Sequence, residues 1–161
     1  MSDIGSLHDT DFLAWTRHQT EALRAAAQLG ANMPLDWELL AEEIEGLGKQ
    51  LQFELENRLD TIIEHLLELQ FSPARQAYAG WRRTIRLSRS EIERLLEGNS
   101  SLRQGIGGTV TQLGARTARR VAIDLRERRE ITVAVMTRLN QATLTEDQVL
   151  GDWFPADPDG G

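Results

Sequence analysis

The feature that most constrains the fold is a long apolar stripe at helical spacing. Between Trp37 and Leu69 an apolar residue recurs every three or four positions, which places the stripe on one face of an α-helix. Asp36 is the expected N-cap. At about 1.5 Å per residue this helix would reach about 51 Å, whereas a compact chain of this size has a diameter of about 39 Å. We therefore expect either a bend or break at Gly46 and Gly48 or an elongated molecule.

Helical periodicity continues through the rest of the chain. The expected helices cover residues 12–29, capped by Asp9 or Thr10 and stopped by Gly30, then 37–69, 73–97, 102–125 and 131–139. A capping box of Thr145 with Gln148 predicts a short closing helix, and Trp153, Phe154 and Pro155 follow it as an aromatic clasp. The apolar arc widens at the end of the second helix, which indicates cover from several neighbours. We expect an all-α fold, an elongated helical bundle with a long central helix.

Length and composition favour one soluble domain. The 161 residues suit a single helical domain over 1–156, followed by a disordered tail over 157–161. No apolar run is long enough to span a membrane, and the absence of cysteine excludes disulfides and thiolate metal sites. The first residues lack the basic start and apolar run of a secretory signal. We expect a cytoplasmic protein.

Charge is sorted along the chain. Residues 1–71 contain fourteen acidic and four basic residues, residues 72–138 contain six and fourteen, and the remainder contains five acidic residues and no basic one. The acidic and arginine-rich segments can neutralise each other by folding together, or the arginines can form an anion-binding face. Arg82, Arg86 and Arg89 form a basic row beside the apolar stripe of the third helix, and we expect this row to pair with the acidic helices.

Several segments resemble a known family. They are Asp9-Thr10-Asp11-Phe12 with Trp15, Leu40-Ala41-Glu42-Glu43-Ile44-Glu45 with Leu47-Gly48, His65-Leu66-Leu67, Trp81 with Ile85 and Arg89, and Ser101-Leu102-Arg103. They are similar to the bacterial family named domain of unknown function twenty-nine. The resemblance implies an all-helical fold and no assigned activity. The chain departs from the family pattern at Asn140-Gln141-Ala142-Thr143, where proline and cysteine commonly precede the last short helix.

Polar residues near the apolar stripes form the candidate site. His65 lies within the stripe of the long helix, and we interpret it as a core residue bonded to a backbone carbonyl or to a carboxylate. The carboxylate candidates are Asp9, Asp11, Glu43 and Glu68. Glu43 lies at the border of the stripe and could pair with the arginine row. The candidate polar cluster comprises Asp9, Asp11, Glu43, His65, Trp81, Arg82, Arg86 and Arg89.

Other chemistries have weaker support. The sequence lacks the two Glu-x-x-His pairs of di-iron bundles, a second histidine at zinc-ligand spacing, and the Gly-x-Ser-x-Gly elbow of serine hydrolases. Gly105, Gly107 and Gly108 lack the Lys-Ser/Thr ending of a phosphate loop. We therefore expect no metal and no cofactor. Nucleic-acid binding through the arginines is not favoured, because the chain carries a net charge of −7.

The sequence thus favours a non-catalytic protein-interaction or self-association module. We expect a homo-oligomer, at least a dimer, or a protein partner. One alternative is a ligand-binding or metal-binding enzyme with a polar pocket around His65, Glu43, Trp81 and Arg82. A second alternative is an arginine-mediated nucleic-acid-binding or regulatory module.

Overall fold

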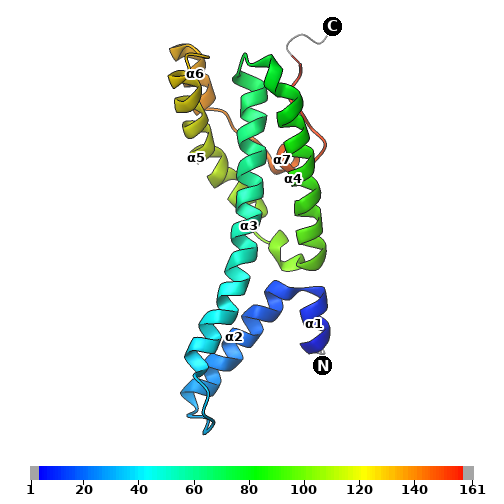
Figure 1. Ribbon diagram of the computed structural model, residues 1–161, viewed down its shortest axis with the longest axis vertical. Coiled ribbons are helices and arrows are strands. Elements are labelled where there is room, and N and C mark those ends of the chain that lie inside the picture. Colours follow the sequence, from blue (N-terminus) through cyan, green and yellow to red (C-terminus); the bar gives the residue numbers. More distant parts are fainter. Residues whose placement is uncertain (1–3, 158–161) are drawn as a thin grey trace. The chain divides into compact units, whose positions relative to one another are not determined.

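The computed structural model describes residues 4–157, and their regular structure is helical. The helices are α1 (Ile4–Thr10), α2 (Phe12–Gln28), α3 (Trp37–Phe71), α4 (Tyr78–Gly98), α5 (Ile106–Glu127), α6 (Val133–Asn140) and α7 (Glu146–Leu150), with the 3₁₀ turns η1 (Arg75–Ala77) and η2 (Ser100–Arg103) (Figure 1). Over this part of the chain the only bridge-type pairing is an isolated one, between Asp11 and Asn99. The all-α expectation is confirmed. No helix within 4–157 is both long and apolar enough to cross a membrane.

Helix α3 is continuous over its 35 residues, so Gly46 and Gly48 do not break it. Asp36 caps it as expected, because its Oδ1 accepts a hydrogen bond from the Leu39 N–H at 3.1 Å. The last third of α3 contains five apolar residues with at most 3% of their surface exposed, which agrees with cover from several neighbours. These residues are Ile62, Ile63, Leu66, Leu67 and Leu69.

The chain forms two compact units. Unit 1 comprises the residues up to Leu55 together with Glu93–Gln104, and unit 2 comprises Glu56–Ile92 together with the residues from Gly105 onward. Helices α3 and α4 each contribute residues to both units. Unit 1 has twelve acidic and five basic residues, a net charge of −7, whereas unit 2 has thirteen of each and is neutral. The single domain over 1–156 remains a prediction.

In unit 1, α2 packs closely along the first half of α3 (Figure 1). A Cβ atom at Gly48 would lie 2.6 Å from Thr16 Oγ1 and 3.1 Å from Leu13 Cδ1, so only glycine permits this approach. The N-cap of α2 is Asp11 rather than Asp9 or Thr10, because residues 4–10 form α1, which the sequence pattern did not predict. Gly30, with φ of 64°, follows the end of α2, as predicted.

In unit 2, α3 lies between α4 on one side and α5 on the other (Figure 1). The core is formed by fully buried aliphatic residues from these helices and from α6 and α7, namely Leu59, Ile62, Ile63, Leu66, Leu67, Ile85, Ile92, Val110, Val121, Leu125, Leu139 and Val149. The helix expected over 131–139 is α6, and the predicted capping box of Thr145 with Gln148 is present. Of the predicted tail, Asp157 bonds to Arg75 at 3.3 Å, and residues 158–161 lie outside the described residues.

Candidate functional site

The structure divides the candidate polar cluster between the two units. Unit 1 contains Asp9, Asp11 and Glu43, and unit 2 contains His65, Trp81, Arg82, Arg86 and Arg89. Each group is therefore described within its own unit. Asp9 and Glu43 are exposed, and Asp9 Oδ1 lies 3.0 Å from His8 Nδ1.

Asp11 of unit 1 accepts four hydrogen bonds. Its Oδ1 accepts hydrogen bonds from the Ala14 N–H at 3.0 Å and from Ser101 Oγ at 2.8 Å. Its Oδ2 accepts from Ser100 Oγ at 3.0 Å and from the Ser101 N–H at 2.9 Å. Burial by itself would raise the pKa of Asp11, but these hydrogen bonds outweigh it and lower the pKa below its ordinary value. Asp11 thus caps α2 and fastens it to η2.

Asn99 extends this contact. Its Oδ1 accepts from the Leu13 N–H at 3.1 Å and its Nδ2 donates to the Leu95 carbonyl at 3.0 Å. The sequence pattern did not predict Asn99, Ser100 or Ser101 as partners of Asp11. The only local signal is the Asn99-Ser100-Ser101 run itself, which is common in turns and helix caps.

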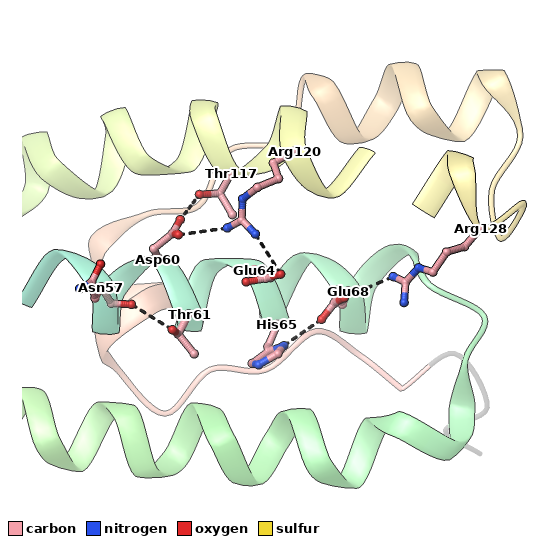
Figure 2. Close-up of polar contacts among 9 residues, drawn as sticks. All are labelled: Asn57, Asp60, Thr61, Glu64, His65, Glu68, Thr117, Arg120 and Arg128. Carbon is pink, nitrogen blue, oxygen red and sulfur yellow. Dashed lines mark hydrogen bonds and ion pairs between the residues drawn. The ribbon is translucent and has the colours of Figure 1, made fainter. Parts of the chain in front are cut away.

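His65 in unit 2 has Glu68 as its carboxylate partner, one of the four candidates that the sequence left open. Its Nδ1 lies 2.8 Å from Glu68 Oε2, one helical turn later on α3 (Figure 2). The imidazole stacks with the Trp81 indole, with ring centroids 6.2 Å apart and planes 21° apart. The second oxygen of Glu68 lies 3.4 Å from an Arg128 guanidinium nitrogen. Glu68, 8% exposed, therefore lies between a histidine and an arginine and orients the imidazole.

The acidic face of α3 pairs with α5. Asp60 accepts hydrogen bonds from Thr117 Oγ1 and, at 3.0 Å, from Arg120, whose other terminal nitrogen donates to Glu64 Oε1 at 3.1 Å (Figure 2). Burial would lower the pKa of Arg120, but the carboxylates of Glu64, Asp60 and Asp124 outweigh burial and raise it. In the part of the chain that the structure describes, Arg120 and Arg128 thus join the acidic helix to its basic neighbour. The arginine row of α4, which was expected to pair with the acidic helices, does not make these ion pairs among the described residues.

The arginine row of α4 divides into different environments. Arg89 is buried, and it donates from Nε to the Val149 carbonyl at 2.9 Å and from one terminal nitrogen to the Gln148 and Trp153 carbonyls, both at 2.8 Å. Burial lowers the pKa of Arg89, and the charge of Asp152 partly opposes this. The Phe154 ring lies under both Arg89, at 4.9 Å, and Arg82, at 5.4 Å, whereas Arg86 is exposed. Arg82 and Arg89 therefore hold the C-terminal segment against α4, and the row does not present one basic face.

Two cavities lie apart from these polar groups. One, of about 270 Å³, follows the contact of α2 with α3 and is lined by residues that include Thr16, Arg17 and Lys49. The other, of about 170 Å³, lies between α5 and residues 140–144, where the chain departs from the family pattern. Across 4–157, no three His, Cys, Asp or Glu side chains are grouped so that they could hold a metal ion.

The geometry defines an all-helical protein in which the predicted site residues mainly tie helices together. The chain belongs to the family described as Domain of unknown function DUF29, whose model matches residues 7–154. It is similar to the crystal structure of an alpha-helical protein of unknown function from Rhodospirillum rubrum, with a TM-score of 0.68 and 22% sequence identity over 91% of this chain and 90% of that one. That similarity shows the fold alone. No curated protein matches the chain.

Proposed function

We propose that the protein is a non-catalytic protein-interaction module whose binding surface lies on unit 1. The observation that carries this proposal is a concentration of exposed apolar side chains on the α2–α3 hairpin. Seven of them fall within 25 residues of sequence, and we call them the apolar hairpin surface: Leu29, Met33, Leu35, Leu39, Leu40, Leu47 and Phe53. An exposed apolar surface of this kind, with polar residues around it, is typical of protein-binding sites.

The part of this surface on α3 has the spacing of a helix-pairing seam. Leu40 and Leu47 are 39% and 43% exposed, and the partly buried Ile44 and Leu51 complete a three-four repeat with them. Such a repeat places the four side chains on one stripe of the helix, where a second helix can pack. We call Leu40, Ile44, Leu47 and Leu51 the α3 seam.

The polar groups of the two units support the same proposal. The four hydrogen bonds to Asp11 and the three from Arg89 satisfy these buried groups inside the fold. Nδ1 of His65 is occupied by Glu68, and one face of its ring lies against Trp81. These contacts favour structural roles for the groups, whereas the side chains of the apolar hairpin surface stay exposed.

The test compares two variants of the full chain. Leu40→Glu with Leu47→Glu introduces charge into the α3 seam, and Leu87→Glu, at a 54% exposed site on α4, is the matched control. Light scattering measures association with a second copy against the 18.1 kDa mass of one chain, and affinity purification from the native cell measures association with other proteins. We expect the seam variant to lose the association and the control to keep it. An unassociated wild-type chain, or a seam variant that binds equally well, would refute the proposal.

A further inference from the structure

The charge of unit 1 restricts what can bind to its apolar surface. The unit carries the whole net charge of the chain, −7. Exposed acidic residues surround the α3 seam in sequence, and they include Asp36, Glu38, Glu42 and Glu43. A partner that covers the seam must therefore approach a concentrated negative charge, which favours a basic surface.

One of these acidic residues, Glu43, lies on the helix face beside the α3 seam. At about 100° per residue, Glu43 projects about 70° from the centre of the α3 seam, on the side away from the buried Ala41 and Gly48. Asp36 precedes the helix, and its carboxylate caps the Leu39 N–H. Glu43 is exposed and directly precedes Ile44 of the seam. This is the relation between the flanking charged positions and the apolar positions of paired helices, where the flanking residues set the choice of partner.

A second copy of the chain matches this surface poorly. In a symmetric pair of unit 1 surfaces, two units that each have a net charge of −7 would face each other, and their acidic flanks would lie together. The basic surfaces of the chain itself offer few apolar contacts. On α4, Leu87 accompanies the exposed Arg83 and Arg86, and on α5, Ile123 is the corresponding exposed aliphatic residue, so neither helix supplies a three-four apolar repeat on its exposed side within 4–157.

Resting on the proposed function, we infer that the α3 seam binds a basic amphipathic helix of another protein. Leucine-like side chains of that helix at three-four spacing fill the seam, and its lysine or arginine flanks face Glu43. The apolar contacts provide affinity, and the charges select the partner and accelerate the encounter. The acidic, leucine-rich hairpin thus specifies the chemistry of its ligand.

The test uses synthetic peptides and the full-length chain. The first probe is a fluorescently labelled 21-residue helix with leucine at three-four spacing and lysine elsewhere. A second peptide has the same composition in an order that removes the spacing, and a third has glutamate in place of lysine. Anisotropy titrations measure each against the wild type, Leu40→Glu with Leu47→Glu, Glu43→Lys and the control Leu87→Glu. Circular dichroism confirms that each variant is folded.

We expect the patterned leucine-lysine peptide to bind the wild type at least about tenfold more tightly than either other peptide. The seam variant should lose at least about tenfold in affinity, the Glu43→Lys variant should bind more weakly with a shallower salt dependence, and the Leu87→Glu variant should be unchanged. Equal binding of the patterned and reordered peptides, or of the wild type and the seam variant, overturns the inference. Self-association that the seam variant alone abolishes, without peptide binding, also overturns it and leaves the proposed function standing. If the chain neither binds the patterned peptide nor associates with any partner, both the inference and the proposed function are refuted.

Discussion

Asp11 keeps a charge inside unit 1, where 8% of its surface is exposed. Removal of a carboxylate from water is unfavourable unless hydrogen bonds replace the lost hydration. Ala14, Ser100 and Ser101 provide four such bonds, and they hold the pKa of Asp11 below its ordinary value. A group whose pKa is lowered by folding stabilises the folded state above its unfolded pKa, and this contribution is lost as the pH falls through the folded pKa.

We predict that Asp11→Asn lowers the free energy of unfolding at pH 7 by about 1–3 kcal/mol, because the amide NH₂ cannot accept from the donors that face the carboxylate. The difference from wild type should shrink below about pH 4, where the unfolded carboxyl group becomes protonated. Urea unfolding at pH 7, 5 and 3 measures this. Asp9→Asn, at an exposed site two residues earlier, is the control and should change little at any of these pH values. A difference between wild type and Asp11→Asn that is as large at pH 3 as at pH 7 would contradict the assignment.

Arg89 and Arg86 lie one turn apart on α4 but should respond differently to substitution. Arg89→Lys keeps the charge but loses the planar fork that reaches three carbonyls, and we predict a loss of about 1–3 kcal/mol. Arg86→Ala should stay within about 0.5 kcal/mol, because Arg86 is exposed. The sequence alone suggested Arg86 as a stabilising partner of the acidic helices. Thermal and urea unfolding compare the two variants, and an Arg86 effect equal to that of Arg89 would restore that earlier interpretation.

Partners close in sequence were easier to predict than distant ones. Glu68 was among the four candidate carboxylates for His65, and it is the one that lies three residues away, at a neighbouring position of the same helix. Ser100 and Ser101, which bond to Asp11, are 89 and 90 residues away from it, and the partners of Arg89 are backbone carbonyls about 60 residues away, which no local pattern encodes. The sequence therefore identified several polar residues that matter to the fold but paired few of them correctly.

At the scale of the helices, the contact of α2 with α3 depends on the absence of a side chain at Gly48. We predict that Gly48→Ala destabilises unit 1 by about 1–3 kcal/mol, because the new Cβ would meet Thr16 Oγ1 at 2.6 Å. The Thr16 hydroxyl cannot move freely, since it donates to the Leu13 carbonyl at 2.8 Å. Adding Thr16→Ala to the variant should recover part of the loss, because it removes the atom in the way. Urea unfolding of the single and double variants measures both effects.

Gly46→Ala is the matched control in the same helix. No atom lies within 4 Å of a Cβ placed at Gly46, so we expect this variant to gain up to about 1 kcal/mol from the better helix propensity of alanine. The opposite signs expected at two glycines separated by one residue distinguish close packing from a general effect of glycine. A gain in both variants would show that α2 does not approach α3 as described.

Apolar periodicity predicted most of the helices, but the residues at which they begin and end differ from the predicted ones. The predicted core stripes on α3, α4 and α5 are buried at Ile62, Ile85 and Val121, because three-four spacing places such residues on one face. Helix α1 was missed because its short sequence has little apolar periodicity. The break at Gly46 and Gly48, one of two alternatives that the sequence left open, does not occur, since a glycine costs a helix interior only about 1 kcal/mol and the packing of Gly48 against Thr16 offsets it.

At the scale of the whole molecule, the two units share continuous helices. Leu55 and Glu56 lie on either side of the division between the units, yet both are inside α3, and Ile92 and Glu93 are both inside α4. Unfolding one unit alone would leave two helices ending without caps and would expose their apolar faces. Because helix formation is cooperative, such a state is unfavourable. The single domain expected from the sequence should therefore unfold as one cooperative unit.

We predict that a core substitution in unit 2 shifts the unfolding of unit 1 equally. Trp15 and Trp37 report on unit 1, and Trp81 and Trp153 report on unit 2, so replacing either pair with phenylalanine gives a probe for the other unit. Leu59→Ala, at a fully buried position of unit 2, should cost about 2–5 kcal/mol. If the chain is one domain, both fluorescence probes move to the same lower urea midpoint, and Leu13→Ala in unit 1 produces the reciprocal shift. Movement of the unit 2 probe alone would instead establish two independently folding domains joined by long helices.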